Sequence, residues 1–142
     1  MTDNHNHMRL VLKSDSRNEA LARTAVAAFI AQLDPSMSQV DDIKTAVSEA
    51  VTNAIIHGYN EQGDAGDITL SCRYTDRELY IDIQDTGTGI ADVAEAMTPL
   101  YTTKPDEDRS GLGFTVMESF MDTVVVESSK GAGTTVRMTK KV

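Results

Sequence analysis

Apolar residues recur with a helical period in two segments of the first half of this chain. From Asn18 to Leu33 they lie three or four positions apart, which predicts an amphipathic helix that ends at Asp34-Pro35. A second helix is expected from Ser38 to Gly58, with Ser38 and Asp41 as an imperfect capping box. Its apolar stripe is wide enough to bury the helix against a sheet and consists of Ile43, Val47, Ala50, Val51, Ala54 and Ile55.

Alternation of apolar and polar residues predicts the strands. The expected strands are Met8 to Lys13, Ile68 to Tyr74, Leu79 to Ile83, Val124 to Ser128 and Thr134 to Met138. A third helix is expected from Gly111 to about Asp122, between the two hairpins. This order favours an α+β fold, a two-layer sandwich with three main helices on one face of a mixed, largely antiparallel sheet.

One long segment, Ala91 to Ser110, shows no sustained period and holds two prolines and mixed charges. Loops of that length in compact domains are usually lids. A chain of 142 residues fits one domain that buries roughly two-thirds of its unfolded surface. We therefore expect a single domain over residues 1–142, with 91–110 as a lid and 1–7 as a disordered tail.

Composition narrows the classes of function. The chain has 13 basic and 22 acidic residues, a net charge of −9, which argues against binding nucleic acid or an anionic membrane and allows a basic protein partner. The longest apolar run, Ala25 to Ala31, is too short to span a bilayer. The single cysteine, Cys72, lies on the apolar phase of an expected strand, which indicates a buried thiol in a reducing compartment. A cytoplasmic protein is expected.

Polar side chains line one stripe of the second helix, where Glu49, Asn53 and His57 recur every four residues. Such a row opposite an apolar face is more often a solvated surface than a site. The functional alternative gives Asn53 an amide oxygen for Mg²⁺ and lets Glu49 accept a hydroxyl proton. We interpret His57 as a helix-end residue favoured by the helix dipole.

Two glycine motifs lie downstream of this stripe. Asp85-Thr86-Gly87-Thr88-Gly89-Ile90 follows a strand, and its carboxylate can accept a hydrogen bond from the amino group of a base. Alone, such a motif is more often a turn that begins with Asp, and it lacks the third glycine of a dinucleotide fingerprint.

The second motif, Ser110-Gly111-Leu112-Gly113-Phe114, stands at the start of the third helix, where free backbone amides favour a phosphate. Alone, it is more often an ordinary loop-to-helix junction. Lys104 and Arg109 lie just upstream in the lid. Arg109 is placed to reach a phosphoryl group in transfer, although a lid arginine is usually solvated.

The three motifs in this order resemble the ATP-binding fold shared by histidine kinases, type II topoisomerases, Hsp90 and mismatch-repair ATPases. The segments 48–58, 99–105 and 109–118 are more closely similar to the anti-sigma-F factors of spore-forming bacteria. That resemblance extends from about Met8 to Lys140.

What the resemblance implies is an ATP- and Mg²⁺-dependent serine/threonine protein kinase that releases ADP. It would phosphorylate an anti-anti-sigma factor on serine, sequester a sporulation sigma factor and form a homodimer, with no direct contact to nucleic acid or membrane. Carried over by position, Glu49 is the base, Arg109 contacts the terminal phosphate, Asn53 binds Mg²⁺, and Arg23 docks both partner proteins. The implied nucleotide contacts are Asn53, Asp85, Gly87, Gly89, Ile90, Thr103, Lys104, Ser110, Gly111, Leu112, Gly113 and Thr134.

Other classes of function are also compatible with these motifs. A nucleotide-gated module would grip a sigma factor without chemistry, but would need neither Glu49 nor Arg109. An ATPase clamp would require further domains, for which 142 residues leave no room. A related kinase that regulates a stress-response sigma factor is the nearest rival and is separated by similarity alone.

Overall fold

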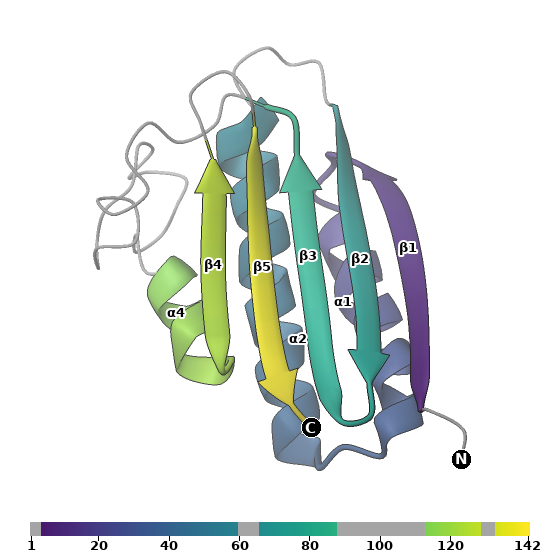
Figure 1. Cartoon of the computed structure of the whole chain (residues 1–142). Helices are drawn as coiled ribbons and strands as arrows, with labels where there is room; N and C mark the ends of the chain where they lie inside the picture. The colour runs from purple at the N-terminus through teal and green to yellow at the C-terminus, as the bar shows by residue number, and fades with distance from the viewer. Residues whose placement is uncertain (1–3, 60–65, 88–112, 129–132) are drawn as a thin grey trace.

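A single sheet forms one layer of the molecule (Figure 1). The computed structural model describes residues 4–59, 66–87, 113–128 and 133–142. Within these ranges the sheet has the order β1-β2-β3-β5-β4, and all neighbouring strands are antiparallel. The strands are β1 (His5–Lys13), β2 (Asp67–Thr75), β3 (Glu78–Asp85), β4 (Thr123–Ser128) and β5 (Thr134–Lys141).

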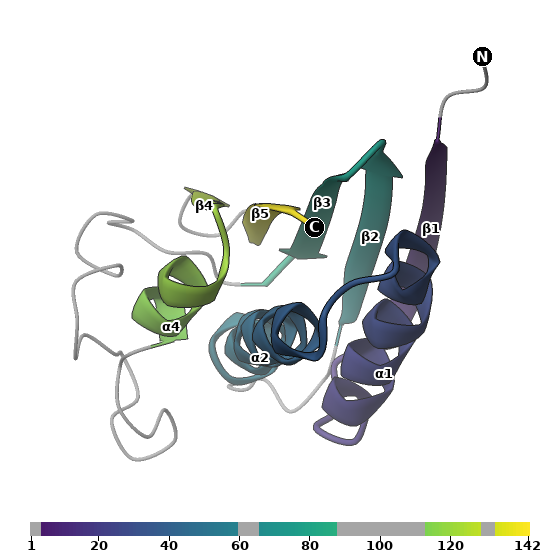
Figure 2. The same ribbon diagram turned by 90° about the horizontal axis from the view of Figure 1, so that it is seen from below.

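Helices form the second layer. Figure 2 shows α1 (Asn18–Ile30), α2 (Met37–Asn53) and α4 (Gly113–Phe120) on the same side of the sheet. The central helix, α2, packs against both α1 and α4. This arrangement confirms the expected α+β sandwich, with an antiparallel sheet throughout the described residues.

The core lies between the two layers, because alternate residues of each strand face the helices. Ile81 and Ile83 of β3 and Ile43 and Val47 of α2 are almost completely buried. Burial of each such side chain contributes about 1.5–3 kcal/mol to folding. Cys72 is 1% exposed, as predicted, and burial raises the pKa of its thiol to about 12, with a further contribution from the charge of Asp82.

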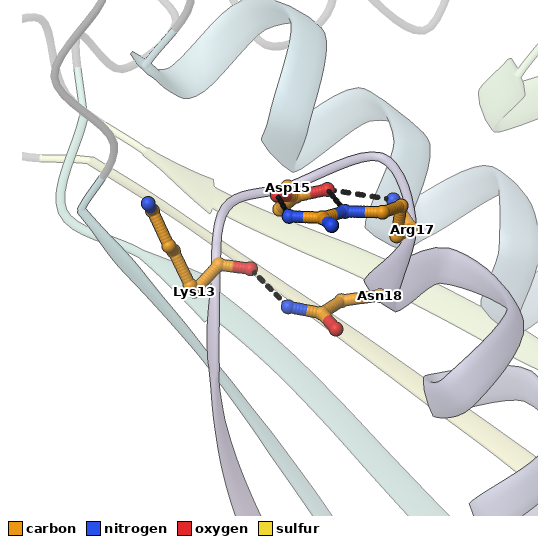
Figure 3. A network of polar contacts seen from close by, with 4 residues as sticks. All are labelled: Lys13, Asp15, Arg17 and Asn18. Carbon is orange, nitrogen blue, oxygen red and sulfur yellow. Dashed lines mark hydrogen bonds and ion pairs between the residues drawn. The ribbon is translucent and has the colours of Figure 1, made fainter.

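A short polar link turns the chain from β1 into α1 (Figure 3). The Asp15 carboxylate accepts hydrogen bonds from the backbone N–H of Arg17 at 2.9 Å and from its guanidinium at 2.7 Å. The amide of Asn18 donates to the Lys13 carbonyl at 2.8 Å. The Arg17 hydrogen bonds hold the pKa of Asp15 well below its usual range. Because Arg17 is exposed, the ion pair itself contributes little stability, and the bonds mainly fix the turn.

The start of α2 differs from the sequence-based expectation. The N-cap is Ser36 rather than Ser38, and its hydroxyl accepts the backbone N–H of Gln39 at 3.1 Å. The Gln39 side chain in turn accepts the backbone N–H of Ser36 at 3.0 Å, which completes a capping box. The helix therefore begins at Met37.

Other boundaries also differ. The first strand begins at His5, so residues 5–7 belong to β1 rather than to a disordered tail. The helical stretch after Asn53 is a π-helix, η2 (Ala54–Tyr59), and the last turn after α1 is a 3₁₀-helix, η1 (Ala31–Leu33). The last α-helix ends at Phe120, two residues before the expected Asp122.

Several expected features lie outside the described residues. These are the lid at 91–110, most of the loop before β2 and the centre of the last hairpin turn. None of the helices in the described ranges has the length and apolar character needed to cross a membrane.

Candidate active site

The polar stripe of α2 meets the first residue of α4. A Cβ atom placed on Gly113 would lie 2.8 Å from Asn53 Nδ2 and 3.4 Å from Glu49 Oε2. The glycine therefore packs directly on both side chains, which are half-buried. The stripe is thus not simply a solvated helix face, because the start of α4 lies over it.

The helix geometry changes at this point. The α-helical repeat of α2 ends at Asn53, and the π-helical η2 follows and packs against β3. Short π-helical turns occur frequently at functional sites. His57 lies in η2, but its side chain falls outside the described residues, so its interpretation as a helix-end residue stays a prediction.

The amide oxygen of Asn53 can bind a hard cation, and the neighbouring carboxylate of Glu49 can accept a proton. In the described part of the chain, no group of three or more His, Cys, Asp or Glu is placed to hold a metal ion. A Mg²⁺ ion here would fit the donor set as one that keeps waters and phosphate oxygens and takes one protein oxygen, from Asn53.

A buried carboxyl group forms the second part of the site. Asp85 ends β3 and is only 5% exposed. Burial raises the pKa of Asp85, while hydrogen bonds from the backbone N–H groups of Gly87 and Thr134 act in the opposite direction. The Gly87 N–H lies 2.9 Å from Asp85 Oδ1. The two carboxyl oxygens together have about four acceptor positions, so Asp85 can accept a further donor beside these two.

An open pocket of about 350 Å³ adjoins Asp85, at the end of the sheet where β3 and β4 finish and β5 begins. It is lined by Gln84, Asp85, Glu127, Ser128, Gly133, Thr134 and Thr135. The Ser128 hydroxyl donates to the Gly133 carbonyl at 2.9 Å and lies 2.8 Å from the Thr134 hydroxyl. Pockets of this volume accommodate small-molecule ligands.

Gly133 is required by the shape of this pocket. Its φ is +85°, a backbone conformation that other residues rarely adopt. A Cβ atom on it would collide with the backbone of Asp85 and Thr86. The hairpin backbone therefore approaches the end of β3 more closely than any residue with a side chain would allow.

The two parts of the site lie at the same end of the molecule. In Figure 1 the end of α2 and the end of β3 are both at the top of the view. Through η2, which directly follows Asn53 and packs against β3, the stripe on α2 and the Asp85 pocket are joined.

The structure thus groups six of the residues expected at the site. Glu49, Asn53 and Gly113 form one group, and Asp85, Gly87 and Thr134 form the other. The remaining expected residues lie outside the described ranges and stay predictions: Gly89, Ile90, Thr103, Lys104, Arg109, Ser110, Gly111 and Leu112. Sequence reasoning missed Ser128 and the special role of Gly133, for which the only signal was the glycine-rich hairpin turn.

Arg23 lies on α1, away from α4. Its guanidinium forms a loose ion pair with Glu19 at 3.7 Å, and its side chain is 40% exposed. Its Nε atom is buried and has no hydrogen-bond partner among the described residues.

The chain matches known proteins over nearly its whole length. Residues 12–140 match the family described as the histidine kinase-like ATPase domain. The chain is similar to the anti-sigma F factor of Clostridium botulinum (strain Eklund 17B / Type B), with 58% identity over 136 residues, which cover 96% of this chain and 94% of the relative. The anti-sigma F factor of Bacillus subtilis (strain 168) is 54% identical over 135 residues, 95% of this chain and 92% of the relative.

Two solved structures share the fold. The RsbU and RsbW domains of a Mycobacterium tuberculosis protein align with a TM-score of 0.69 at 18% identity, over 96% of this chain and 32% of that chain. The histidine kinase domain of a blue-light-activated kinase from Erythrobacter litoralis aligns with a TM-score of 0.56 at 18% identity, over 87% and 60%. At such identity the two structures support the fold alone.

Proposed function

We propose that this chain is a serine protein kinase and a sigma-factor antagonist. The proposal starts from its family, because the chain belongs to the anti-sigma F factors within the histidine kinase-like ATPase family. Its protein substrate is an anti-anti-sigma factor, and its second partner is a sporulation sigma factor. One observation carries the kinase assignment, namely that the first residue of α4 packs on both Asn53 and Glu49.

The adenine base of the nucleotide would bind in the Asp85 pocket. The Asp85 carboxyl group accepts a hydrogen bond from the amino group of adenine, and Gly87, Gly89, Ile90 and Thr134 border the base. The phosphates extend toward the start of α4, where the amides of residues 110–113 and the side chains of Thr103 and Lys104 bind them. Asn53 would hold Mg²⁺ through its amide oxygen, and the ion would supply positive charge that neutralises the phosphates.

Transfer then needs a proton acceptor and a charge partner. Glu49 accepts the hydroxyl proton of the target serine while the serine oxygen bonds to the terminal phosphorus. The bond between that phosphorus and the oxygen that leaves with ADP breaks. Arg109 contacts the phosphoryl group during transfer. Positioning and charge neutralisation supply most of the rate in such reactions.

The partner assignments rest on the family. We expect Arg23 to dock both partner proteins and the working form to be a homodimer. We prefer a sporulation sigma factor over a stress-response one because the motifs resemble the anti-sigma F factors, the name that the relatives carry. The net charge of −9 favours protein partners over direct contact with nucleic acid.

A phosphotransfer assay with Mg-ATP and the anti-anti-sigma protein tests the proposal. We expect Glu49→Gln to lower the transfer rate at least about a hundredfold, since general-base catalysis contributes that much. Its ATP affinity, measured by calorimetry, should stay near the wild-type value. The matched control is Glu118→Gln, which changes an exposed glutamate of α4 and should transfer normally.

The outcomes separate the two main hypotheses. If the Glu49→Gln variant transfers phosphate at the wild-type rate, Glu49 is not the base. A wild-type protein that binds the sigma factor in a nucleotide-dependent way but transfers no phosphate would instead be a nucleotide-gated binding module.

A further inference from the structure

Gly113 leaves room for the two functional side chains of α2. A Cβ atom at this position would lie 2.8 Å from Asn53 Nδ2, 3.3 Å from Asn53 Oδ1 and 3.4 Å from Glu49 Oε2. The first of these distances is shorter than real Cβ atoms show, because it lies well inside van der Waals contact. With any other residue at position 113, the Asn53 amide would have to move.

The obstacle is a side chain and not the backbone. The end of Asn53 can rotate away, so an alanine at position 113 has room after a small rearrangement. Alanine is also more favourable than glycine in a helix. Gly133 differs in this respect, because a Cβ atom there would meet the backbone of Asp85 and Thr86. A substitution at Gly113 should therefore disturb the site and leave the fold intact.

We propose that Gly113 is a positioning residue, because its lack of a side chain lets the Asn53 amide and the Glu49 carboxylate keep their places beneath the start of α4. This inference rests on the proposed function, which makes Asn53 the ligand of Mg²⁺ and Glu49 the base. Through this contact the helix that begins with the phosphate motif also sets the geometry of the metal ligand on α2.

A different role for the glycine predicts a different result. If Gly113 only lets phosphate oxygens approach the backbone, an alanine would weaken nucleotide binding with or without metal. If it acts through Asn53, the loss is confined to the Mg²⁺-dependent part of binding. The loss also disappears once the Asn53 side chain has been removed.

Calorimetric titration of ADP tests the proposal, with Mg²⁺ and separately with EDTA, on Gly113→Ala, Asn53→Ala and the double variant. We expect Gly113→Ala to weaken Mg²⁺-dependent binding about tenfold to a hundredfold, as changes in the groups that orient a metal ligand do, and to match wild type in EDTA. In the Asn53→Ala background, Gly113→Ala should have no further effect. Thermal unfolding of Gly113→Ala should occur at or above the wild-type temperature.

Three results would overturn this role, namely wild-type Mg²⁺ dependence in Gly113→Ala, an equal loss in EDTA, and an added loss in the Asn53→Ala background. An unfolded Gly113→Ala protein would overturn it as well, because the glycine would then serve the fold. A wild-type protein whose ADP affinity does not depend on Mg²⁺ would instead refute the metal assignment of the proposed function, and the inference with it.

Discussion

The carboxyl group of Asp85 lies in a buried position that disfavours its ionised form. It is 5% exposed, and burial raises its pKa above the ordinary value of 3.8. The folded protein therefore holds the Asp85 proton more tightly than the unfolded chain does. The contribution of this group to stability is fully present below the unfolded pKa and is lost as the pH rises through the folded pKa. Where the pH exceeds the folded pKa, ionisation of Asp85 costs the fold stability, and a role in binding the amino group of adenine would explain why the residue is kept there.

Asp85→Asn should therefore lower nucleotide affinity and raise stability. A hydrogen bond to a charged group contributes about 2 kcal/mol, so ATP affinity should fall at least about tenfold in calorimetry. In urea unfolding at pH 7 the variant should have the higher midpoint, because the buried charge is gone and an acceptor oxygen remains for Gly87. The difference in midpoint should shrink as the pH is lowered toward 4.

The matched control is Asp82→Asn, on the same strand and the opposite face of the sheet, where the side chain is half-buried. It should leave ATP affinity unchanged. Equal ATP affinity in Asp85→Asn would refute the adenine contact, and a lower urea midpoint at pH 7 would refute the cost of the buried charge.

At the scale of elements, α2 carries both the proposed metal ligand and the proposed base, so its first turn matters for the site at its other end. Ser36→Ala should lower the free energy of unfolding by about 1 kcal/mol, because it removes the acceptor for the Gln39 N–H. Ser38→Ala is the control, since Ser38 is exposed and lies inside the first turn. It should change stability by less than about 0.5 kcal/mol. Equal losses in the urea midpoint would mean that the capping box does not stabilise α2.

The sequence predicted the elements better than their ends. The apolar stripe of α2 and the alternation in β3 determine which faces are buried, and both were confirmed. Ser36 and Ser38 are each followed three residues later by a polar residue, but only Ser36 has the glutamine that a capping box requires, so the sequence held the signal for the correct cap. The π-helix after Asn53 was not predicted, because six residues are too few to distinguish its period from that of an α-helix.

The site was predictable to a similar extent. The motifs named Asn53 and Gly113 as residues of a nucleotide site, whereas the direct contact between them is a finding of the structure that the sequence did not predict. Ser128 was missed, because its place beside Thr134 depends on the register of β4 against β5. That register is set by the packing of both strands and by a turn whose geometry the sequence does not specify.

At the scale of the whole molecule, the proposed docking residue and the proposed chemistry lie on different helices. Figure 2 shows α2 between α1, which carries Arg23, and α4, which begins at the candidate active site. A change at Arg23 therefore has no direct route to the nucleotide, and binding of a partner protein should be separable from binding of ATP.

Arg23→Ala should weaken binding of the sigma factor and of the anti-anti-sigma protein at least about tenfold, as loss of an interface arginine does. Its guanidinium is available to a partner, since the side chain is 40% exposed and the ion pair with Glu19 spans 3.7 Å. ATP affinity should stay at the wild-type value. Calorimetry measures all three affinities on the same protein.

The control for charge is Arg17→Ala, which removes the same charge from an 87% exposed side chain and keeps the backbone N–H that Asp15 accepts. If docking depends on the position of Arg23, Arg17→Ala binds both partners normally, because exposed charges act weakly and are screened by salt. Equal weakening by the two variants would mean that the partners respond to net charge, with no specific contact at Arg23. A loss of ATP affinity in Arg23→Ala would mean that α1 is coupled to the nucleotide site through α2, and the separation of docking from chemistry would be wrong.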